Sequence, residues 1–124
     1  MKRLLLQIYT QNRAEAFAFY QDAFLATPGY CETDANGNVI HAELNICGQS
    51  IAVGDLPDDQ TENITGNTMQ FCLHFEPGEE HIIQHAYDAM KGQSKVLVPL
   101  GPCFFSAYMT DIVDPYGVRW CLFV

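Results

Sequence analysis

The chain has 124 residues, enough for one domain with a hydrophobic core, and 48% of them are hydrophobic, which excludes a disordered chain. Its 15 acidic residues outnumber its 6 basic ones and give a net charge of −9, which argues against binding to nucleic acid or to an anionic membrane surface. Its five cysteines include no C-x-x-C pair, and no apolar run is long enough for a signal peptide or a membrane span, so we expect a cytoplasmic protein with reduced thiols.

The first half of the chain is predicted to form one helix and four strands. Apolar Phe17, Tyr20 and Phe24 lie on one side of the expected helix, and Asn12 is its expected N-cap. The Thr27-Pro28-Gly29 segment is expected to end this helix. The elements expected from these patterns are a strand at residues 4–10, a helix at about 13–25, and strands at 30–33, 40–46 and 50–53.

The second half repeats this order of elements. Pro77 is expected in the first turn of its helix, and Gly92 is expected to cap the other end. The Asp114-Pro115-Tyr116-Gly117 sequence is typical of a turn between two strands. The expected elements are a strand at residues 68–75, a helix after Pro77, and strands at 95–97, 107–112 and 118–123.

Together the two halves predict a single domain of the α+β class. Two β-α-β-β-β modules, at about residues 1–55 and 67–124, would be joined by residues 56–66. We expect them to form a curved mixed sheet around a pocket that binds a small molecule.

The predicted strands leave a second, more polar face when their apolar face packs on a helix. Such a face either meets water or, where sheets curl around a common space, lines a pocket. The side chains on this face are Gln7, Tyr9, His41, Glu43, Gln70, Cys72 and His74.

Two pairs of residues are candidates for chemistry. His41 and Glu43 share one strand face, where they are suited to act as a base with its orienting partner or as metal ligands, although such pairs are also common in purely structural roles. His81 and His85 have the helical spacing of zinc ligands but lie away from the apolar stripe, so we expect them to be exposed and structural.

Several segments resemble the glyoxalase/bleomycin-resistance/dioxygenase superfamily. Residues 16–24, AFAFYQDAF, resemble its "A-x-x-FY-x-x-x-F" helix, and residues 39–48 resemble its third strand. Residues 110–120, TDIVDPYGVRW, look like the closing hairpin of the PhnB-like branch, and Phe104-Phe105 stands where that branch has "FW". The resemblance implies paired modules of the vicinal oxygen chelate fold and a homodimer.

The resemblance also implies where metal ligands would lie in the enzymes of this superfamily. These positions hold Leu5, then Gln70 or Thr68, and finally Cys121. Leucine cannot bind a cation and glutamine is a weak ligand, so we expect no metal and no other cofactor. The alternative is a displaced site built from His41, Glu43 and His74.

Three functions follow from this reading. The first is a metal-free small-molecule-binding protein. The second is an enzyme of the lyase, isomerase or dioxygenase type, with Glu43 as general base beside His41. The third is an accessory or dimerisation domain whose pocket is filled by its own side chains. The ligand-binding residues expected for the first function are Gln7, Tyr9, Gln70, Cys72, Phe104, Phe105, Tyr108 and Cys121. The ligand itself is not predicted.

Overall fold

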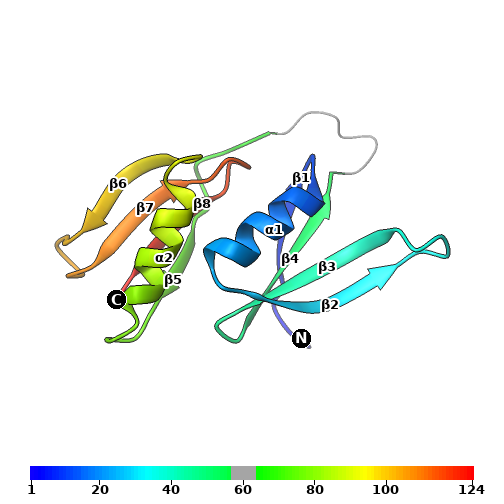
Figure 1. The fold of residues 1–124 in the computed structure, drawn as a ribbon, viewed down its shortest axis with the longest axis horizontal. Helices are drawn as coiled ribbons and strands as arrows, with labels where there is room; N and C mark the ends of the chain where they lie inside the picture. The colour runs from blue at the N-terminus through cyan, green and yellow to red at the C-terminus, as the bar shows by residue number, and fades with distance from the viewer. Residues whose placement is uncertain (57–63) are drawn as a thin grey trace. The chain divides into compact units, whose positions relative to one another are not determined.

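The computed structural model describes residues 1–56 and 64–124, which form two compact units (Figure 1). The N-terminal unit spans Met1–Asn63 and the C-terminal unit spans Ile64–Val124. The connection predicted at 56–66 includes residues 57–63, which lie outside the described residues. Neither helix of the described chain is long and apolar enough to cross a membrane.

The N-terminal unit is a four-stranded mixed sheet with one helix. In the sheet order β1-β4-β3-β2, β1 runs parallel to β4 and the other neighbours are antiparallel. Its elements are β1 (Leu6–Thr10), α1 (Arg13–Ala23), β2 (Thr27–Thr33), β3 (Val39–Ile46) and β4 (Gln49–Asp55).

The C-terminal unit repeats this topology. Its sheet has the order β5-β8-β7-β6, with β5 parallel to β8 and antiparallel pairs elsewhere. Its elements are β5 (Phe71–His74), α2 (Glu80–Met90), β6 (Lys95–Gly101), β7 (Met109–Val113) and β8 (Arg119–Phe123). The predicted α+β class with two β-α-β-β-β modules is therefore confirmed.

Each unit has its own core between the helix and one face of its sheet. In the N-terminal unit, α1 contacts β1 and β4, and it buries Tyr20 together with Ala16 and Ala23. In the C-terminal unit, α2 contacts β8, where Trp120 and Leu122 are fully buried. Full burial of one large apolar side chain stabilises a fold by roughly 1.5–3 kcal/mol, so these few residues hold each sheet to its helix.

Two helix boundaries differ from the sequence prediction. The first helix ends at Ala23 rather than Leu25, because Leu25 adopts a left-handed conformation with φ 51°. The Thr27-Pro28-Gly29 segment then begins β2 instead of forming a loop. The second helix begins at Glu80 rather than near Pro77, because Gly78 has φ 102°, which no right-handed helix accommodates.

The Asp-Pro-Tyr-Gly segment between β7 and β8 is a turn held by one carboxylate. Asp114 Oδ1 accepts hydrogen bonds from the backbone N–H groups of Tyr116 and Val118, each 2.9 Å long. Asp114 Oδ2 accepts a hydrogen bond of 2.8 Å from Nε1 of Trp120. Because the same carboxylate closes the turn and satisfies the buried indole, this motif is explained by structure alone.

Candidate functional site

The two sheets present equivalent rows of residues on the face opposite their helices, called here the polar face. In the N-terminal unit, Ala52 of β4 pairs with Gln7 on one side and with Glu43 on the other. In the C-terminal unit, Cys121 of β8 pairs with Cys72 and with Asp111 in the same way. Glu43 and Asp111 therefore occupy equivalent positions in the repeat.

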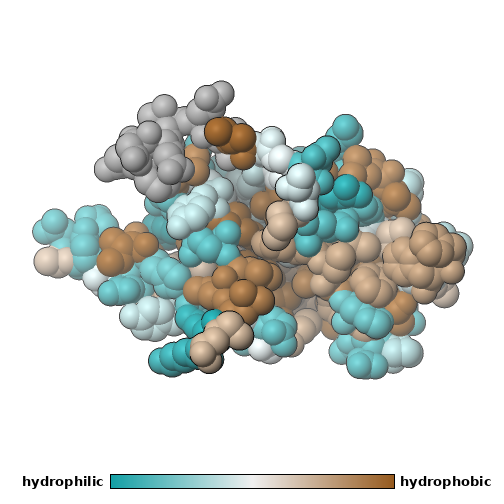
Figure 2. Space-filling model, turned by 180° about the vertical axis from the view of Figure 1, so that it is seen from behind, coloured by the Kyte–Doolittle hydropathy of each residue, from teal (hydrophilic) through white to brown (hydrophobic). Residues whose placement is uncertain are grey.

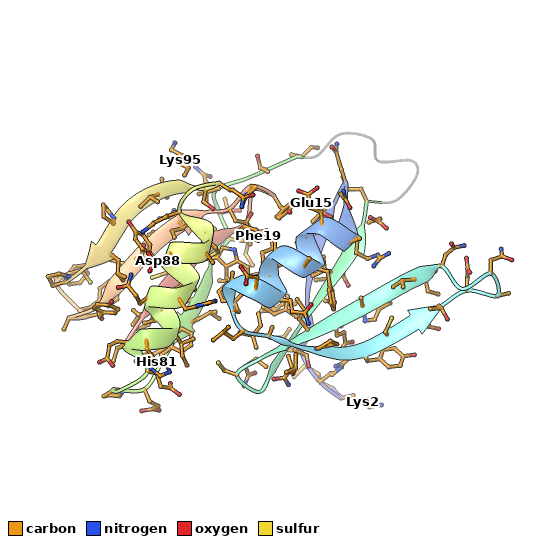
Figure 3. All side chains as sticks on the ribbon, viewed as in Figure 1. Lys2, Glu15, Phe19, His81, Asp88 and Lys95 are labelled. Atoms are coloured by element: carbon orange, nitrogen blue, oxygen red, sulfur yellow. The ribbon has the colours of Figure 1, made fainter. Side chains whose placement is uncertain are left out.

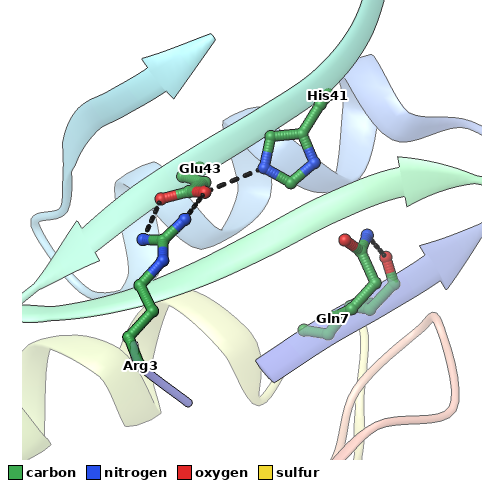
Figure 4. A network of polar contacts seen from close by, with 5 residues as sticks. Arg3, Gln7, His41 and Glu43 are labelled. Atoms are coloured by element: carbon green, nitrogen blue, oxygen red, sulfur yellow. Dashed lines mark hydrogen bonds and ion pairs between the residues drawn. The ribbon is translucent and has the colours of Figure 1, made fainter. Parts of the chain in front are cut away.

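Glu43 is the centre of a charged network on the N-terminal polar face (Figure 4). Its side chain is only 3% exposed, and it accepts two hydrogen bonds from Arg3, from Nη1 at 3.0 Å and from Nη2 at 2.6 Å. Nε2 of His41 lies 2.8 Å from Oε1. Because a carboxylate only accepts, this imidazole nitrogen carries the proton. The predicted His41–Glu43 pair is thus in contact.

The hydrogen bonds from Arg3 lower the pKa of Glu43 most, the hydrogen bond from His41 lowers it further, and the resulting pKa is about 2. The carboxylate is therefore charged at neutral pH, and both of its oxygens already have partners. A base with so low a pKa removes protons poorly, because proton-transfer efficiency is greatest when the pKa lies near the working pH.

The rest of the N-terminal polar face is less polar than its sequence indicates. Gln7 donates from Nε2 to the backbone oxygen of Ile8 at 3.1 Å, so its amide group is turned back onto its own strand (Figure 4). Gly54 makes room for this amide, since a Cβ added there would lie 2.9 Å from the same nitrogen. Tyr9, which pairs with Gly54, is half-exposed.

Asp111 is the centre of the corresponding network on the C-terminal polar face. It accepts from Nε of Arg119 at 3.0 Å, from Nη2 of Arg119 at 2.6 Å, and from Nε2 of Gln70 at 3.1 Å. The thiol of Cys72 lies 3.6 Å from Oε1 of Gln70 and donates to it. The network thus joins β5, β7 and β8 across the face.

The residues at the implied metal positions do not fit a metal ion. Burial raises the pKa of Cys121 to about 11, and the position offers one sulfur where the enzymes of this superfamily have a glutamate. Leu5 has no donor atom, and Gln70 is engaged with Asp111. Within residues 1–56 and 64–124, no group of three His, Cys, Asp or Glu side chains is placed to hold a metal.

A row of aromatic rings continues from the polar network towards solvent. His74 stacks on Phe123 with ring centroids 4.4 Å apart, and Phe123 meets Phe105 edge to face at 5.3 Å. Phe105 in turn contacts Phe104 at 5.1 Å, and Phe104 is 99% exposed. These four residues are called the aromatic series. Figure 2 shows that apolar side chains also gather in patches on the face in view.

The structure brings together most of the residues predicted as ligand contacts in the C-terminal unit. The exception is Tyr108, whose hydroxyl donates to Gln84 of α2 at 2.6 Å, on the helix side of the sheet. His81 is exposed on α2, as expected (Figure 3), whereas His85 is only half-exposed. The predicted residues that share the polar face of the C-terminal unit, or adjoin it, are Gln70, Cys72, Phe104, Phe105 and Cys121.

Four residues of these networks are new: Arg3, Asp111, Arg119 and Phe123. A signal for two of them was present in the alternation of β8, where Arg119 and Phe123 have the same parity as Cys121. Arg3 lies outside the strands, where no alternation applies. The pairing of Asp111 with Arg119 depends on hairpin register, which alternation does not define.

Comparison with known proteins places the fold. No family model matches this sequence, and no curated protein is significantly similar to it. The PhnB protein from Bacillus cereus is 24% identical, with 98% of each chain covered and a TM-score of 0.77. A gene product of Arabidopsis thaliana is also 24% identical, with 100% of this chain and 98% of that chain covered and a TM-score of 0.65.

A third similar structure is the fosfomycin resistance protein FosX from Listeria monocytogenes, complexed with Mn(II) and 1S,2S-dihydroxypropylphosphonic acid. It is 13% identical, with 99% of this chain and 92% of that chain covered and a TM-score of 0.70. Each of these structures shares the fold of this chain over nearly its whole length. The fold of this chain is therefore the glyoxalase-like fold that its sequence resembles.

Proposed function

We propose that this protein binds a small organic molecule on the polar face of its C-terminal sheet, without the help of a metal ion. The observation that carries this proposal is the combination of the buried Asp111–Arg119 pair with the exposed aromatic series on one sheet face. Ligand sites combine apolar and aromatic surface with a few fixed polar groups, and this face offers both.

A further observation supports a role without metal. Both buried carboxylates of the repeat, Glu43 and Asp111, are already neutralised by arginine. A divalent cation would have to displace Arg3 or Arg119 to bind both oxygens of either carboxylate. The fold also suits small ligands, as the FosX complex with a phosphonic acid illustrates for that protein.

A thermal-shift screen of a diverse small-molecule collection, run with and without EDTA, tests this function. A ligand present at 100 times its Kd stabilises the protein by about 2.7 kcal/mol, so hits raise the Tm by several degrees. We expect these shifts to survive EDTA, to shrink in Phe104→Ala, and to persist in Ile40→Ala, which removes an exposed apolar side chain of the other unit. One tightly bound divalent metal per chain, whose removal abolishes the shifts, would overturn the proposal.

An enzymatic role is the second candidate, favoured by the contact between His41 and Glu43. In this proposal, an enzyme of the lyase, isomerase or dioxygenase type would use Glu43 as general base towards its substrate. The low pKa of Glu43 requires the substrate to separate Arg3 from it first, because only then does the carboxylate gain useful basicity. Unchanged turnover in Glu43→Gln, for any activity found in the purified protein, would contradict this assignment.

We also propose that the protein is a cytoplasmic homodimer, on the basis of the superfamily resemblance and the absence of C-x-x-C pairs. Light scattering at working concentration is expected to give twice the mass of the 13.9 kDa chain. A monomeric mass would refute the dimer.

A further inference from the structure

We propose that the ligand of the C-terminal polar face is an elongated aromatic acid, with its acidic group on Arg119 and its ring against the aromatic series. This inference rests on the proposed function and names the chemical class of the ligand. It follows from three properties of the face: its unused hydrogen-bonding capacity, its exposed rings, and the spacing between them.

The first property is that the polar end of the face has donors left over but few acceptors. Oδ2 of Asp111 accepts from both Arg119 and Gln70, and Oδ1 accepts from Arg119. The amide oxygen of Gln70 accepts from Cys72. A guanidinium has five N–H groups, and Asp111 engages only Nε and one Nη2 hydrogen. The ligand group that completes this network is therefore an acceptor.

The remaining donors favour an acidic acceptor over a neutral one. Arg119 is 36% exposed and is held by the bidentate pair with Asp111, so its outer edge has a fixed direction. A planar guanidinium edge matches the two oxygens of a carboxylate, and charge-assisted hydrogen bonds are roughly twice as strong as neutral ones. A cationic ligand would instead have to separate Asp111 from Arg119 to find an acceptor.

The second property is that the exposed ring at the other end is carried by a turn that hydrogen bonds hold in place. The turn that carries Phe104 is closed by a hydrogen bond of 2.8 Å from the Cys103 N–H to the Ser106 oxygen. The hydroxyl of Ser106 donates to the backbone oxygen of Val124 at 2.8 Å, which fastens the turn to the end of the sheet. An ordered phenylalanine that is 99% exposed offers apolar area that a ligand can cover.

Geometry favours an aromatic ligand over an aliphatic one at this end. The rings of Phe104, Phe105 and Phe123 meet edge to face, with interplanar angles of 79° and 87°. A further ring can therefore place its edge against one of these ring faces, or its face against one of these ring edges. Aromatic pairs attract each other beyond the effect of the area that they bury.

The third property is the distance between the two ends. Arg119 and Phe123 lie four residues apart on β8, which is about 13 Å along an extended strand. Between them lie Cys121 and its partner Cys72, both with short side chains. A flat molecule lying along this strand therefore spans about 10–13 Å, the size of a two-ring acid rather than a single-ring one.

Three probes separate the contributions of the acid and the ring. Biphenyl-4-carboxylate carries both features, and biphenyl-4-methanol lacks the charge. Cyclohexanecarboxylate keeps the charge but lacks the aromatic rings. We expect calorimetric titration of the purified full chain to show that biphenyl-4-carboxylate binds at least tenfold more tightly than either of the other two.

Variants test whether this preference arises at the predicted residues. Asp111→Asn combined with Arg119→Gln removes the ion pair without leaving a buried charge, so it should abolish the preference for the acid over the alcohol. If this double variant does not fold, Arg119→Lys replaces it and should weaken acid binding at least fivefold. Phe104→Ala should weaken both biphenyl probes about equally, by at least threefold.

The matched control is the ion pair between Asp88 and Lys91 on α2, the helix on the other side of the same sheet (Figure 3). Asp88→Asn combined with Lys91→Gln makes the same change in charge away from the polar face. This variant is expected to bind all three probes as the parent chain does.

The possible outcomes distinguish this inference from the proposed function. Equal affinity for acid and alcohol, or screen hits of another class on the same face, would overturn the aromatic acid and leave the function intact. Absence of any ligand that responds to Phe104→Ala would overturn both. Self-association that Phe104→Ala abolishes would show that a second copy of the chain occupies the face, and would also overturn the inference.

Discussion

The polar face of each sheet carries one buried carboxylate that an arginine neutralises, but the two arginines come from different parts of their units. Glu43 and Asp111 occupy equivalent positions and are both buried, and each receives two hydrogen bonds from one guanidinium. Arg3 precedes the first strand of its unit, whereas Arg119 belongs to the last strand of the other. The fold therefore specifies the place of the carboxylate but leaves the source of its partner open.

The neighbouring pair of residues on each polar face differs in the size of its side chains. Tyr9 pairs with Gly54 in the N-terminal unit, and the equivalent pair in the C-terminal unit is His74 with Phe123. The first pair leaves space that the Gln7 amide uses, while the second begins the aromatic series. Two copies of one topology thus differ in this row, which holds a glycine with the Gln7 amide beside it in one unit and stacked aromatic rings in the other.

Removal of each arginine is expected to give the largest difference between the halves. Arg119→Met leaves Asp111 without its charged partner, and we expect a clear loss in the free energy of unfolding. Arg3→Met should cost less, because Arg3 is 49% exposed and lies outside the strand, so more of its conformational freedom is lost when the pair forms. Urea unfolding of both variants measures the two losses. Equal losses would show that the two pairs are equivalent in energy as well as in position.

Thiol chemistry is expected to give the next largest effect. With its pKa raised to about 11, Cys121 should be alkylated by iodoacetamide at pH 8 at least about 100-fold more slowly than in the urea-unfolded chain, where a cysteine has a pKa near 8.5. Mass spectrometry of peptides after timed labelling measures the rate. Similar rates in the two states would mean that Cys121 is neither buried nor protonated as described.

The low pKa of Glu43 predicts a pH-dependent contribution to stability from the N-terminal unit. Because the folded value of about 2 lies below the ordinary value of 4.5, this contribution is complete above about pH 5 and is lost as the pH falls towards 2. We expect Glu43→Gln to be about 1–2 kcal/mol less stable at pH 7, with solvent screening of half-exposed Arg3 limiting the effect. The gap between the two proteins should narrow by about half as the pH falls from 7 to 3, as urea unfolding over this range would show. A constant gap would contradict the ion pair.

The smallest effect is expected at Gly54. Gly54→Ala places a Cβ 2.9 Å from the Gln7 amide, and a loss of about 1 kcal/mol or less is expected because that side chain can move. In a Gln7→Ala background the same change should be neutral or stabilising, since alanine loses less entropy than glycine on folding. A double-mutant cycle from thermal unfolding tests this change of sign.

The sequence predicts the order of elements well because each element carries its own period. The stripe of α2 and most of the alternation in β3 assign the buried face correctly, although Ile40 at the start of β3 is exposed. Asn12 is confirmed as the N-cap, with its Oδ1 accepting from the Glu15 N–H at 3.2 Å. The errors fall at boundaries, where single residues such as Leu25 and Gly78 decide the backbone by their positive φ.

The candidate site is less predictable because it is built from contacts between strands. His41 and Glu43 are two residues apart, so alternation suffices to bring them together. The pairing of Asp111 with Arg119 and the contact of Phe105 with Phe123 depend on register and on the path of a loop. Arg3 reaches Glu43 from outside any regular element, where no sequence period applies.

The single tryptophan offers a selective view of folding. Trp120 is fully buried and belongs to the C-terminal unit, and its indole is fixed by Asp114 of the same unit, so its fluorescence reports on the packing of that unit. Far-ultraviolet circular dichroism, in contrast, sees the strands and helices of both. If the two signals change at the same urea concentration, the two units unfold as one cooperative body, and if they separate, each unit is stable by itself.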